Sequence, residues 1–377
     1  VSKPSGGISE DRAEKAVNML RRALVAALAE LGGLEGLDLE GYQPPEVPAV
    51  PQSPPSKEED TKPEKPLIAL EPDKPWLPDK AEIEITKESW DGKVREIVLG
   101  ATEAEGGTRS HTVTIGGETA MPFMHFEGEF PNPPVIAVEI ADRRPDDWSD
   151  LLMEAWGDVM DDPGEWAKAA EKAGAEVLFL RLSLNDAEGN PTTPEQAVKA
   201  VDKILKASGL PLIVFGPGQP EADNELLVEV SNKFKGERLL LGVCEEKNYR
   251  TIVASAMADD HMVIARTAMD VNLAKQLNIL ITDMGLSQDN IVMDPTTGAL
   301  GYGFEYGYSV MERLRIAALQ GDKMTQFPML VTPGEECWKA KESKVGDEVP
   351  ETWGDWETRA LTWESATSIM LAESGAD

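Results

Sequence analysis

The sequence has few side chains of the kinds that usually carry chemistry. Its three histidines, His111, His125 and His261, are never three or four residues apart, so a zinc site of the HExxH type is not expected. Its two cysteines, Cys244 and Cys337, are too few for a four-iron cluster, which generally needs four thiolates. We therefore expect no iron–sulfur cluster or other metal site in this chain, and two small buried thiols.

Polar residues instead follow the ends of short apolar runs. One run ends in Asp294-Pro-Thr-Thr-Gly and continues to Gly-Tyr-Gly before the next helix. A loop so rich in glycine lets the backbone approach a flat or bulky ligand closely. The expected ligand contacts are Asp294, Thr297, Gly298, Gly301 and Tyr302, with Asn272 and Arg266 nearby.

The other polar residues at these positions predict structure rather than chemistry. Asp270 and Asn248 precede amphipathic segments and are expected to be helix N-caps. No histidine lies among the polar residues that follow the runs, so no Ser-His-Asp arrangement is expected there. We assign no catalytic residue.

Regular alternation of strand and helix begins at residue 135. Seven apolar runs are the expected strands: 135–141, 176–182, 210–216, 238–244, 261–267, 290–295 and 327–333. Amphipathic helices are expected at 163–173, 194–207, 222–235, 247–258, 269–285, 305–320 and 355–374. Apolar runs flanked by helices indicate parallel strands covered on the outside. The pattern predicts an α/β fold of the TIM (β/α)8 type, in which functional residues gather at the carboxyl ends of the strands.

The pattern stops one strand short of such a barrel. The sequence ends LAESGAD, where a helix end should lead into the eighth strand. We expect that the chain is truncated or that its tail is missing. A hairpin over 94–130 could close the sheet instead. That alternative is less favoured, because parallel closure needs a crossover of fixed hand.

Three regions precede the expected barrel at 135–377. Residues 1–42 form an N-terminal helical element, with a helix predicted over 9–32. Residues 43–80 contain 11 of the 27 prolines and predict a flexible, extended linker. Residues 81–134 are expected to hold a β-hairpin that leads into the barrel.

The charge balance excludes several kinds of partner. The chain has 68 acidic and 36 basic residues, and its formal net charge is −32. This acidity argues against binding to nucleic acid or to an anionic membrane surface. No apolar run reaches the roughly 18 residues of a membrane-spanning helix, and the N-terminus lacks a signal-peptide core. A cytoplasmic protein is expected.

Six segments are specific enough to compare with known families. They are LGATEAEGGTRSHTVTIGGETAMPF (99–123), HFEGEFPNPPVIAVEI (125–140), LLLGVCEEKNY (239–249), ARTAMDVNLAKQLNILI (265–281), MDPTTGALGYGFEY (293–306) and MERLRIAALQGDKMTQFPML (311–330). These segments resemble the delta subunit of the acetyl-CoA decarbonylase/synthase complex, which in acetogenic bacteria is the small subunit of the corrinoid iron–sulfur protein. The resemblance covers roughly residues 92–377.

The resemblance implies a TIM barrel that pairs with a larger subunit, which carries the four-iron cluster and a corrinoid-binding domain. It implies that a cobalamin-type corrinoid lies between that domain and the top of the barrel. Its cobalt would carry a methyl group between a tetrahydropterin and the nickel site of acetyl-CoA synthase. Acetyl-CoA synthase and methyltransferase components are further implied partners. Family members normally continue past this C-terminus with a final strand and helix.

Two other functions stay open at this point. The barrel could be a pterin-dependent methyltransferase, with Asp294, Asn272 and Asn248 holding the pterin ring. It could also be a scaffold for the multienzyme complex, with the helical element 1–42 docking on its tether. The carrier and scaffold roles are compatible, and we favour both together.

Overall fold

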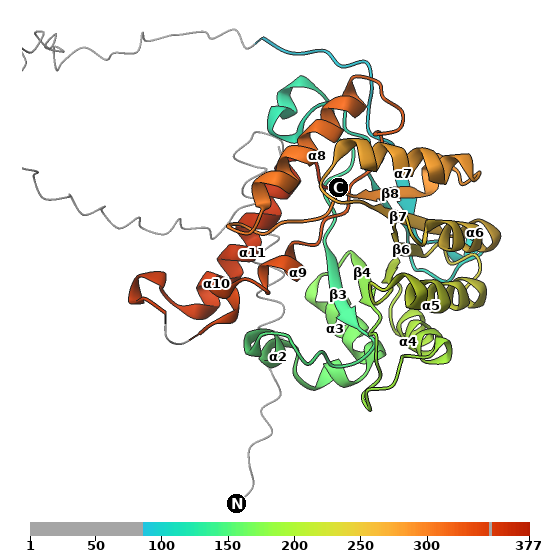
Figure 1. Cartoon of the computed structure of the whole chain (residues 1–377), viewed down its shortest axis with the longest axis vertical. Coiled ribbons are helices and arrows are strands. Elements are labelled where there is room, and N and C mark those ends of the chain that lie inside the picture. The colour runs from blue at the N-terminus through green and yellow to red at the C-terminus, as the bar shows by residue number, and fades with distance from the viewer. Residues whose placement is uncertain (1–85, 347–348) are drawn as a thin grey trace, which may run out of the picture. The chain divides into compact units, whose positions relative to one another are not determined.

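Six parallel strands form the centre of this computed structural model, which describes residues 86–346 and 349–377 (Figure 1). The strands lie in sequence order and pair each with the next. Each lies within one of the expected runs. They are β3 (Ala137–Ala141), β4 (Val177–Arg181), β5 (Leu212–Phe215), β6 (Leu240–Cys244), β7 (Met262–Arg266) and β8 (Ile291–Asp294).

Helices connect consecutive strands and cover one face of the sheet (Figure 1). The seven expected helices are present as α3 (Pro163–Ala173), α4 (Pro194–Ala207), α5 (Pro220–Lys233), α6 (Tyr249–Asp259), α7 (Val271–Asp283), α8 (Phe304–Leu319) and α11 (Trp356–Glu373). Three short helices were not expected: α2 (Asp150–Trp156), α9 (Pro333–Cys337) and α10 (Lys341–Lys344). Short 3-10 helices are η1 (Glu103–Glu105), η2 (Pro122–Glu127), η3 (Gly157–Asp161), η4 (Gln288–Asn290) and η5 (Glu351–Trp353).

Local capping chemistry sets the starts of the connecting helices. The Asp162 carboxylate accepts hydrogen bonds from the first backbone amides of α3, and Pro163 follows it at the first helical position. Thr193 and Gln196 form a capping box at the start of α4. These signals are local, which explains why the bounds of both helices agree with the sequence-based expectation.

The two faces of the sheet have separate cores. Side chains such as Leu178, Val214 and Val263 point to the helices and are buried there. Alternate residues, such as Phe179 and Ile264, point to the opposite face, which we call the inner face. Both faces are apolar, which is why each strand reads as a continuous apolar run.

A two-stranded hairpin covers part of the inner face. Its strands β1 (Ile97–Leu99) and β2 (Val113–Ile115) pair antiparallel, which confirms the expected hairpin. Ile97, Leu99 and Ile115 are buried among the inner-face side chains. The hairpin forms a sheet of its own and does not pair with the six strands. The alternative in which it closes the sheet is therefore wrong, because its apolar face is used for packing.

The seventh expected strand, 327–333, is reduced to a single bridge. Met329 lies beside Met293, which donates to Pro328 O and accepts from Leu330 N, both at 2.8 Å. Prolines at 328 and 333 have no backbone N–H, and this shortens the pairing. On the other side of Met329, the backbone N–H of Asp377 donates to Met329 O at 3.0 Å.

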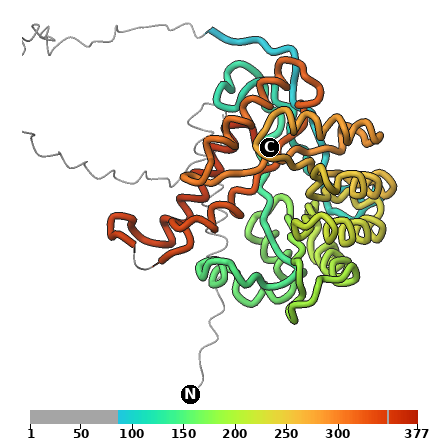
Figure 2. The backbone as a smooth tube through the Cα atoms, viewed as in Figure 1, coloured from blue at the N-terminus to red at the C-terminus, as the bar shows by residue number. Residues whose placement is uncertain are grey.

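The opposite edge of the sheet has no strand beside it in the described chain. β3 pairs only with β4. A cavity of about 770 Å³ lies between β3 and residues 329–332, and α11 lines its outer side. Figure 2 shows the orange and red C-terminal segment returning beside the teal segment that precedes β3. The sheet is thus open where an eighth strand was expected.

Two expectations lie outside the described residues: the helix over 9–32 and the linker over 43–80. Among the helices of the described segments, none has the length and apolar character needed to cross a membrane.

Arg109 joins the hairpin region to the segments that precede β5 and β6 through a buried polar cluster. Its Nη1 donates to Ser208 O (2.7 Å) and Leu210 O (3.1 Å). Its Nε lies 3.4 Å from Glu237 Oε2, and both side chains are almost fully buried. Burial lowers the pKa of Arg109, and the Glu237 carboxylate opposes that effect.

We predict that Arg109→Met lowers the free energy of unfolding by about 3 kcal/mol, because it leaves Glu237 buried without its cation. Urea denaturation measures this. Lys206→Met is the control, since Lys206 forms an exposed pair with Asp202 and should contribute less than about 1 kcal/mol. Equal effects of the two substitutions would contradict the assigned role of Arg109.

Candidate functional site

An ion pair joins the carboxyl ends of β7 and β8. Arg266 and Asp294 are the last residues of these strands and face each other in register. Arg266 Nε donates to Asp294 Oδ2 at 2.7 Å, and the Asp294 side chain is fully buried. The other Asp294 oxygen accepts from the backbone N–H of Thr296 at 2.9 Å. The structure therefore brings together two of the expected site residues.

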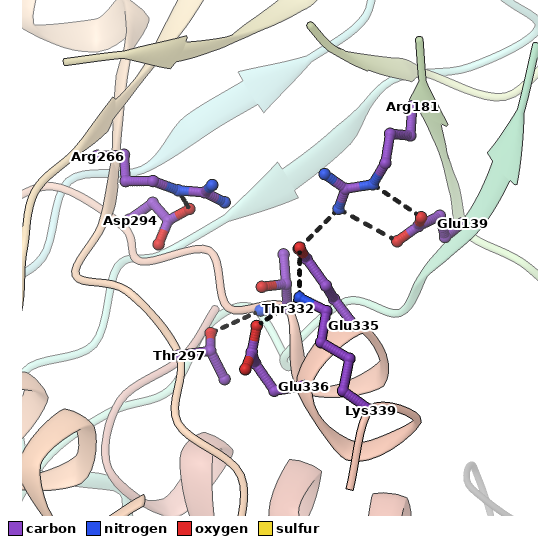
Figure 3. Close-up of polar contacts among 9 residues, drawn as sticks. All are labelled: Glu139, Arg181, Arg266, Asp294, Thr297, Thr332, Glu335, Glu336 and Lys339. Carbon is purple, nitrogen blue, oxygen red and sulfur yellow. Dashed lines mark hydrogen bonds and ion pairs between the residues drawn. The ribbon is translucent and has the colours of Figure 1, made fainter. Parts of the chain in front are cut away.

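A second charged group lies at the end of β4. Arg181 Nε donates to Glu139 of β3 at 2.9 Å, and its Nη2 donates to Glu335 of α9 at 2.8 Å. Lys339 Nζ lies 3.1 Å from Glu335 and 3.0 Å from Glu336. We call these five residues, with Arg266 and Asp294, the carboxyl-edge cluster (Figure 3).

The electrostatics of this cluster favour the charged forms of Arg181 and Glu335. Burial disfavours the charge of Arg181, but Glu139 and Glu335 outweigh it and raise the pKa of the guanidinium. Burial likewise disfavours the Glu335 carboxylate, yet Arg181 and Lys339 hold its pKa below the usual value. The pairing therefore stabilises charges that the partly buried position would otherwise suppress.

The two arginines share one aromatic ring. Phe215, the last residue of β5, lies 5.5 Å from the Arg181 guanidinium and 5.1 Å from that of Arg266. β6 runs between β5 and β7, and a Cβ at Gly242 of β6 would come within 2.9 Å of the Phe215 ring. The missing side chain at Gly242 leaves the space that the ring occupies.

Both guanidinium groups turn toward the space between them (Figure 3). Within the described residues, Arg266 Nη1 and Nη2 and Arg181 Nη1 make no hydrogen bond. The arginine side chains retain 21% and 27% exposure, so these donors are accessible to a ligand. The site can therefore donate several charge-assisted hydrogen bonds.

The expected glycine-rich loop lies beside this cluster. Thr297 is buried, and its hydroxyl accepts from Thr332 N at 2.8 Å. Gly298 packs so closely that a Cβ would meet the Gly303 backbone at 2.7 Å, so its small size serves the loop itself. Gly301 has φ +75°, and Tyr302 is 53% exposed with its hydroxyl donating to Glu342. Gly301 and Tyr302 are thus the loop residues most available to a ligand.

The remaining expected residues do not converge on the cluster. Asn272 is exposed in the first turn of α7, where Asp270 caps the helix as expected. Asn248 occupies the N-cap position of α6 but bonds backward, accepting from Glu245 N and donating to Val243 O. This placement does not favour Asp294, Asn272 and Asn248 as a shared pterin site.

Five cluster residues were not among the expected site residues: Glu335, Glu336 and Lys339 after the last expected strand, and Arg181 and Glu139. Arg181 and Glu139 lie inside apolar strands, where a charge is unusual. Their positions, two residues apart from apolar inner-face neighbours, place them on the inner face. The sequence signal that could have identified both residues was a single charged residue at an inward-facing position of an apolar run.

Other reactive groups of the described chain lie away from the cluster or are unsuited to chemistry. No grouping of histidine, cysteine and carboxylate side chains there could hold a metal ion. Burial raises the pKa of both thiols, that of Cys337 to about 12, so neither is a ready nucleophile. His261 is buried at the start of β7, with its ring nitrogens bonded to Leu239 N and Ser231 O.

The neighbouring loop after β5 depends on a buried carboxylate. Asp223 is buried, and its Oδ1 accepts from Gly218 N at 2.9 Å. Burial raises the pKa of Asp223 to about 6, although hydrogen bonds from the backbone of Gly218 and Gln219 oppose the shift. A raised folded-state pKa means that ionisation costs stability as pH rises from about 4 through 6.

We predict that Asp223→Asn stabilises the chain by about 1–3 kcal/mol at pH 7 and that this gain disappears below about pH 4, because the neutral amide removes the cost of ionisation. Urea denaturation across this pH range measures it. Glu165→Gln, at a mostly exposed carboxylate, is the control and should show no such trend. A pH-independent difference for Asp223→Asn would contradict the assignment.

Comparison with known proteins gives consistent matches. The family model described as CO dehydrogenase/acetyl-CoA synthase delta subunit matches residues 96–368. The delta subunit of the acetyl-CoA decarbonylase/synthase complex from Archaeoglobus fulgidus is 39% identical over 308 residues, covering 79% of this chain and 67% of that protein. Subunit delta 1 from Methanosarcina thermophila is 36% identical over 318 residues, covering 83% and 72%.

Among solved structures, dihydropteroate synthase of Xanthomonas albilineans with 4-aminobenzoic acid aligns with a TM-score of 0.43 and 14% identity, over 66% of this chain and 87% of that one. The sequence matches are far more specific. They run through the strand ends and loops that form the carboxyl-edge cluster. The chain therefore belongs to the CO dehydrogenase/acetyl-CoA synthase delta subunit family.

Proposed function

We propose that this chain covers a corrinoid held jointly with a larger iron–sulfur subunit, and that it helps to hold the acetyl-CoA decarbonylase/synthase complex together. The corrinoid, when bound, supplies a cobalt that can accept and release a methyl group. In this role the methyl group passes between a methyl-tetrahydropterin and acetyl-CoA synthase. Family membership supports the proposal.

The observation that carries the proposal is the accessible, donor-rich carboxyl edge of the sheet. Gly301 and Tyr302 offer an open loop, and Arg266 offers two amino groups without a partner in the described chain. A corrin ring is large, flat and fringed with amides, which need such hydrogen-bond donors. Binding by shape and polar contacts is the task of a protein that holds a cofactor whose chemistry is its own.

The groups near this edge suit binding better than acid–base catalysis. His261 lies buried at the opposite end of β7, and His111 and His125 precede β3. The carboxylates of the carboxyl-edge cluster are engaged with arginine or lysine. The chain's own residues therefore orient the ligand and exclude water, and the reacting partners come from outside.

We also propose that the sheet belongs to an eight-stranded TIM-type barrel. Three observations support this: β3 pairs on one side only among the described residues, Met329 extends the other edge, and Asp377 N donates to Met329 O. The cavity of about 770 Å³ lies between these two edges. The cavity lies where the eighth strand of the proposed barrel would complete the closed sheet.

We predict that Gly301→Trp weakens corrinoid retention about ten-fold, a loss of ~1.4 kcal/mol, because an indole would fill the open loop. The measurement is corrinoid absorbance of the purified complex after gel filtration.

The control is Gly321→Trp, which carries a similar backbone penalty at φ +93° but lies after the far end of α8. Unchanged retention in Gly301→Trp would count against the loop, and loss in both variants would indicate a folding effect. Absence of any corrinoid from the wild-type complex would overturn the proposed function.

A further inference from the structure

We infer that Arg181 and Arg266 form a paired site for neutral carboxamide groups, and that it grips the amide side chains of the corrin periphery. This inference rests on the proposed function and specifies its chemistry. It depends on the two guanidinium groups that share Phe215 and turn toward one another (Figure 3).

The first step of the argument is the charge balance. The carboxyl-edge cluster has three cations, Arg181, Arg266 and Lys339. It has four carboxylates, those of Glu139, Asp294, Glu335 and Glu336, so its sum is 3 − 4 = −1. A phosphate or carboxylate ligand would add to this excess of negative charge and would be repelled. The cluster therefore favours a ligand without net charge.

The second step is the alternation of donors and acceptors. Arg181 and Arg266 present amino groups that no described residue uses, and each lies beside a carboxylate, Glu335 or Asp294. A carboxamide carries a carbonyl that accepts and an NH₂ that donates. It can thus take a hydrogen bond from a guanidinium and give one to the neighbouring carboxylate. Neither an anion nor an amine satisfies both partners at once.

The third step is the rigidity of the pair. Arg181 is held by Glu139 and Glu335 and also lies 5.3 Å from the Phe179 ring. Arg266 is held by Asp294 and by Phe215. Because both side chains are fixed before a ligand arrives, little side-chain entropy is lost on binding. The guanidinium fork matters here, since lysine would supply a single point charge.

The test compares two corrinoids that differ in peripheral charge. Cobinamide carries neutral amides, and cobyrinic acid carries carboxylates at the same positions. Each is titrated by equilibrium dialysis against the full chain together with the subunits that co-purify with it. We expect cobinamide to bind at least about ten-fold more tightly than cobyrinic acid.

Arg266→Lys keeps the positive charge beside Asp294 but removes the forked guanidinium. It should weaken cobinamide binding about ten-fold and reduce the preference for cobinamide over cobyrinic acid. Arg181→Lys should act in the same direction. The matched control is Arg250→Lys, because Arg250 also stacks on an aromatic ring, that of Tyr249, yet is exposed at the start of α6. Thermal unfolding of each variant without corrinoid confirms that it is folded.

The outcomes separate this inference from the proposed function. Equal affinity for the two corrinoids, or a preference for cobyrinic acid, would overturn the carboxamide site while leaving corrinoid binding intact. An unchanged preference in folded Arg266→Lys and Arg181→Lys would overturn the assignment to these arginines. Failure of both corrinoids to bind the wild type would overturn the proposed function and the inference together.

Discussion

Arg181 ends a strand whose other residues are apolar, and its charge persists there because Glu139 and Glu335 contact it from two sides. Glu335 belongs to α9, so this one interaction ties the first two strands of the sheet to the segment that follows Met329. It therefore spans the open side of the sheet, above the cavity lined by β3 and α11. The position of α9 depends on the charge of Arg181, which would be unfavourable in β4 without its carboxylate partners. Through α9, the same charge affects access to the carboxyl edge.

The fold was largely predictable because its signals are local. The capping residues Asp162, Thr193 and Asp270 start the helices that the sequence indicates. Apolar runs on both faces indicate parallel strands. The reduced seventh strand and the short helices α9 and α10 were not predictable in the same way. Their form depends on proline positions and on contacts such as those of Arg359 in α11 with the Glu342 and Val345 carbonyls, which join different elements.

The site was predictable in part. Asp294 and Arg266 stand at strand ends, where position alone suggests function, and the structure pairs them in register. Glu139 and Arg181 lie within strands, and only the three-dimensional order of β3 and β4 shows that they meet. Asn272 illustrates the converse, since its place near a strand end suggested a contact but the turn of α7 leaves it exposed, away from the cluster. Spacing along the chain predicts which residues lie at the carboxyl edge of the sheet. The direction of each side chain then decides whether the residue belongs to the carboxyl-edge cluster.

Gly242 has no side chain and no charge, yet it determines how the charged residues are arranged. The Phe215 ring lies in the space beside it, and through that ring the side chains of β4 and β7 become neighbours across two intervening strands. Arg181, Phe215, Gly242 and Arg266 thus form one packed unit. A methyl group added at position 242 would change the electrostatics of the edge without altering any ionisable residue. The effects of substitutions at these four positions should accordingly be coupled and not simply add.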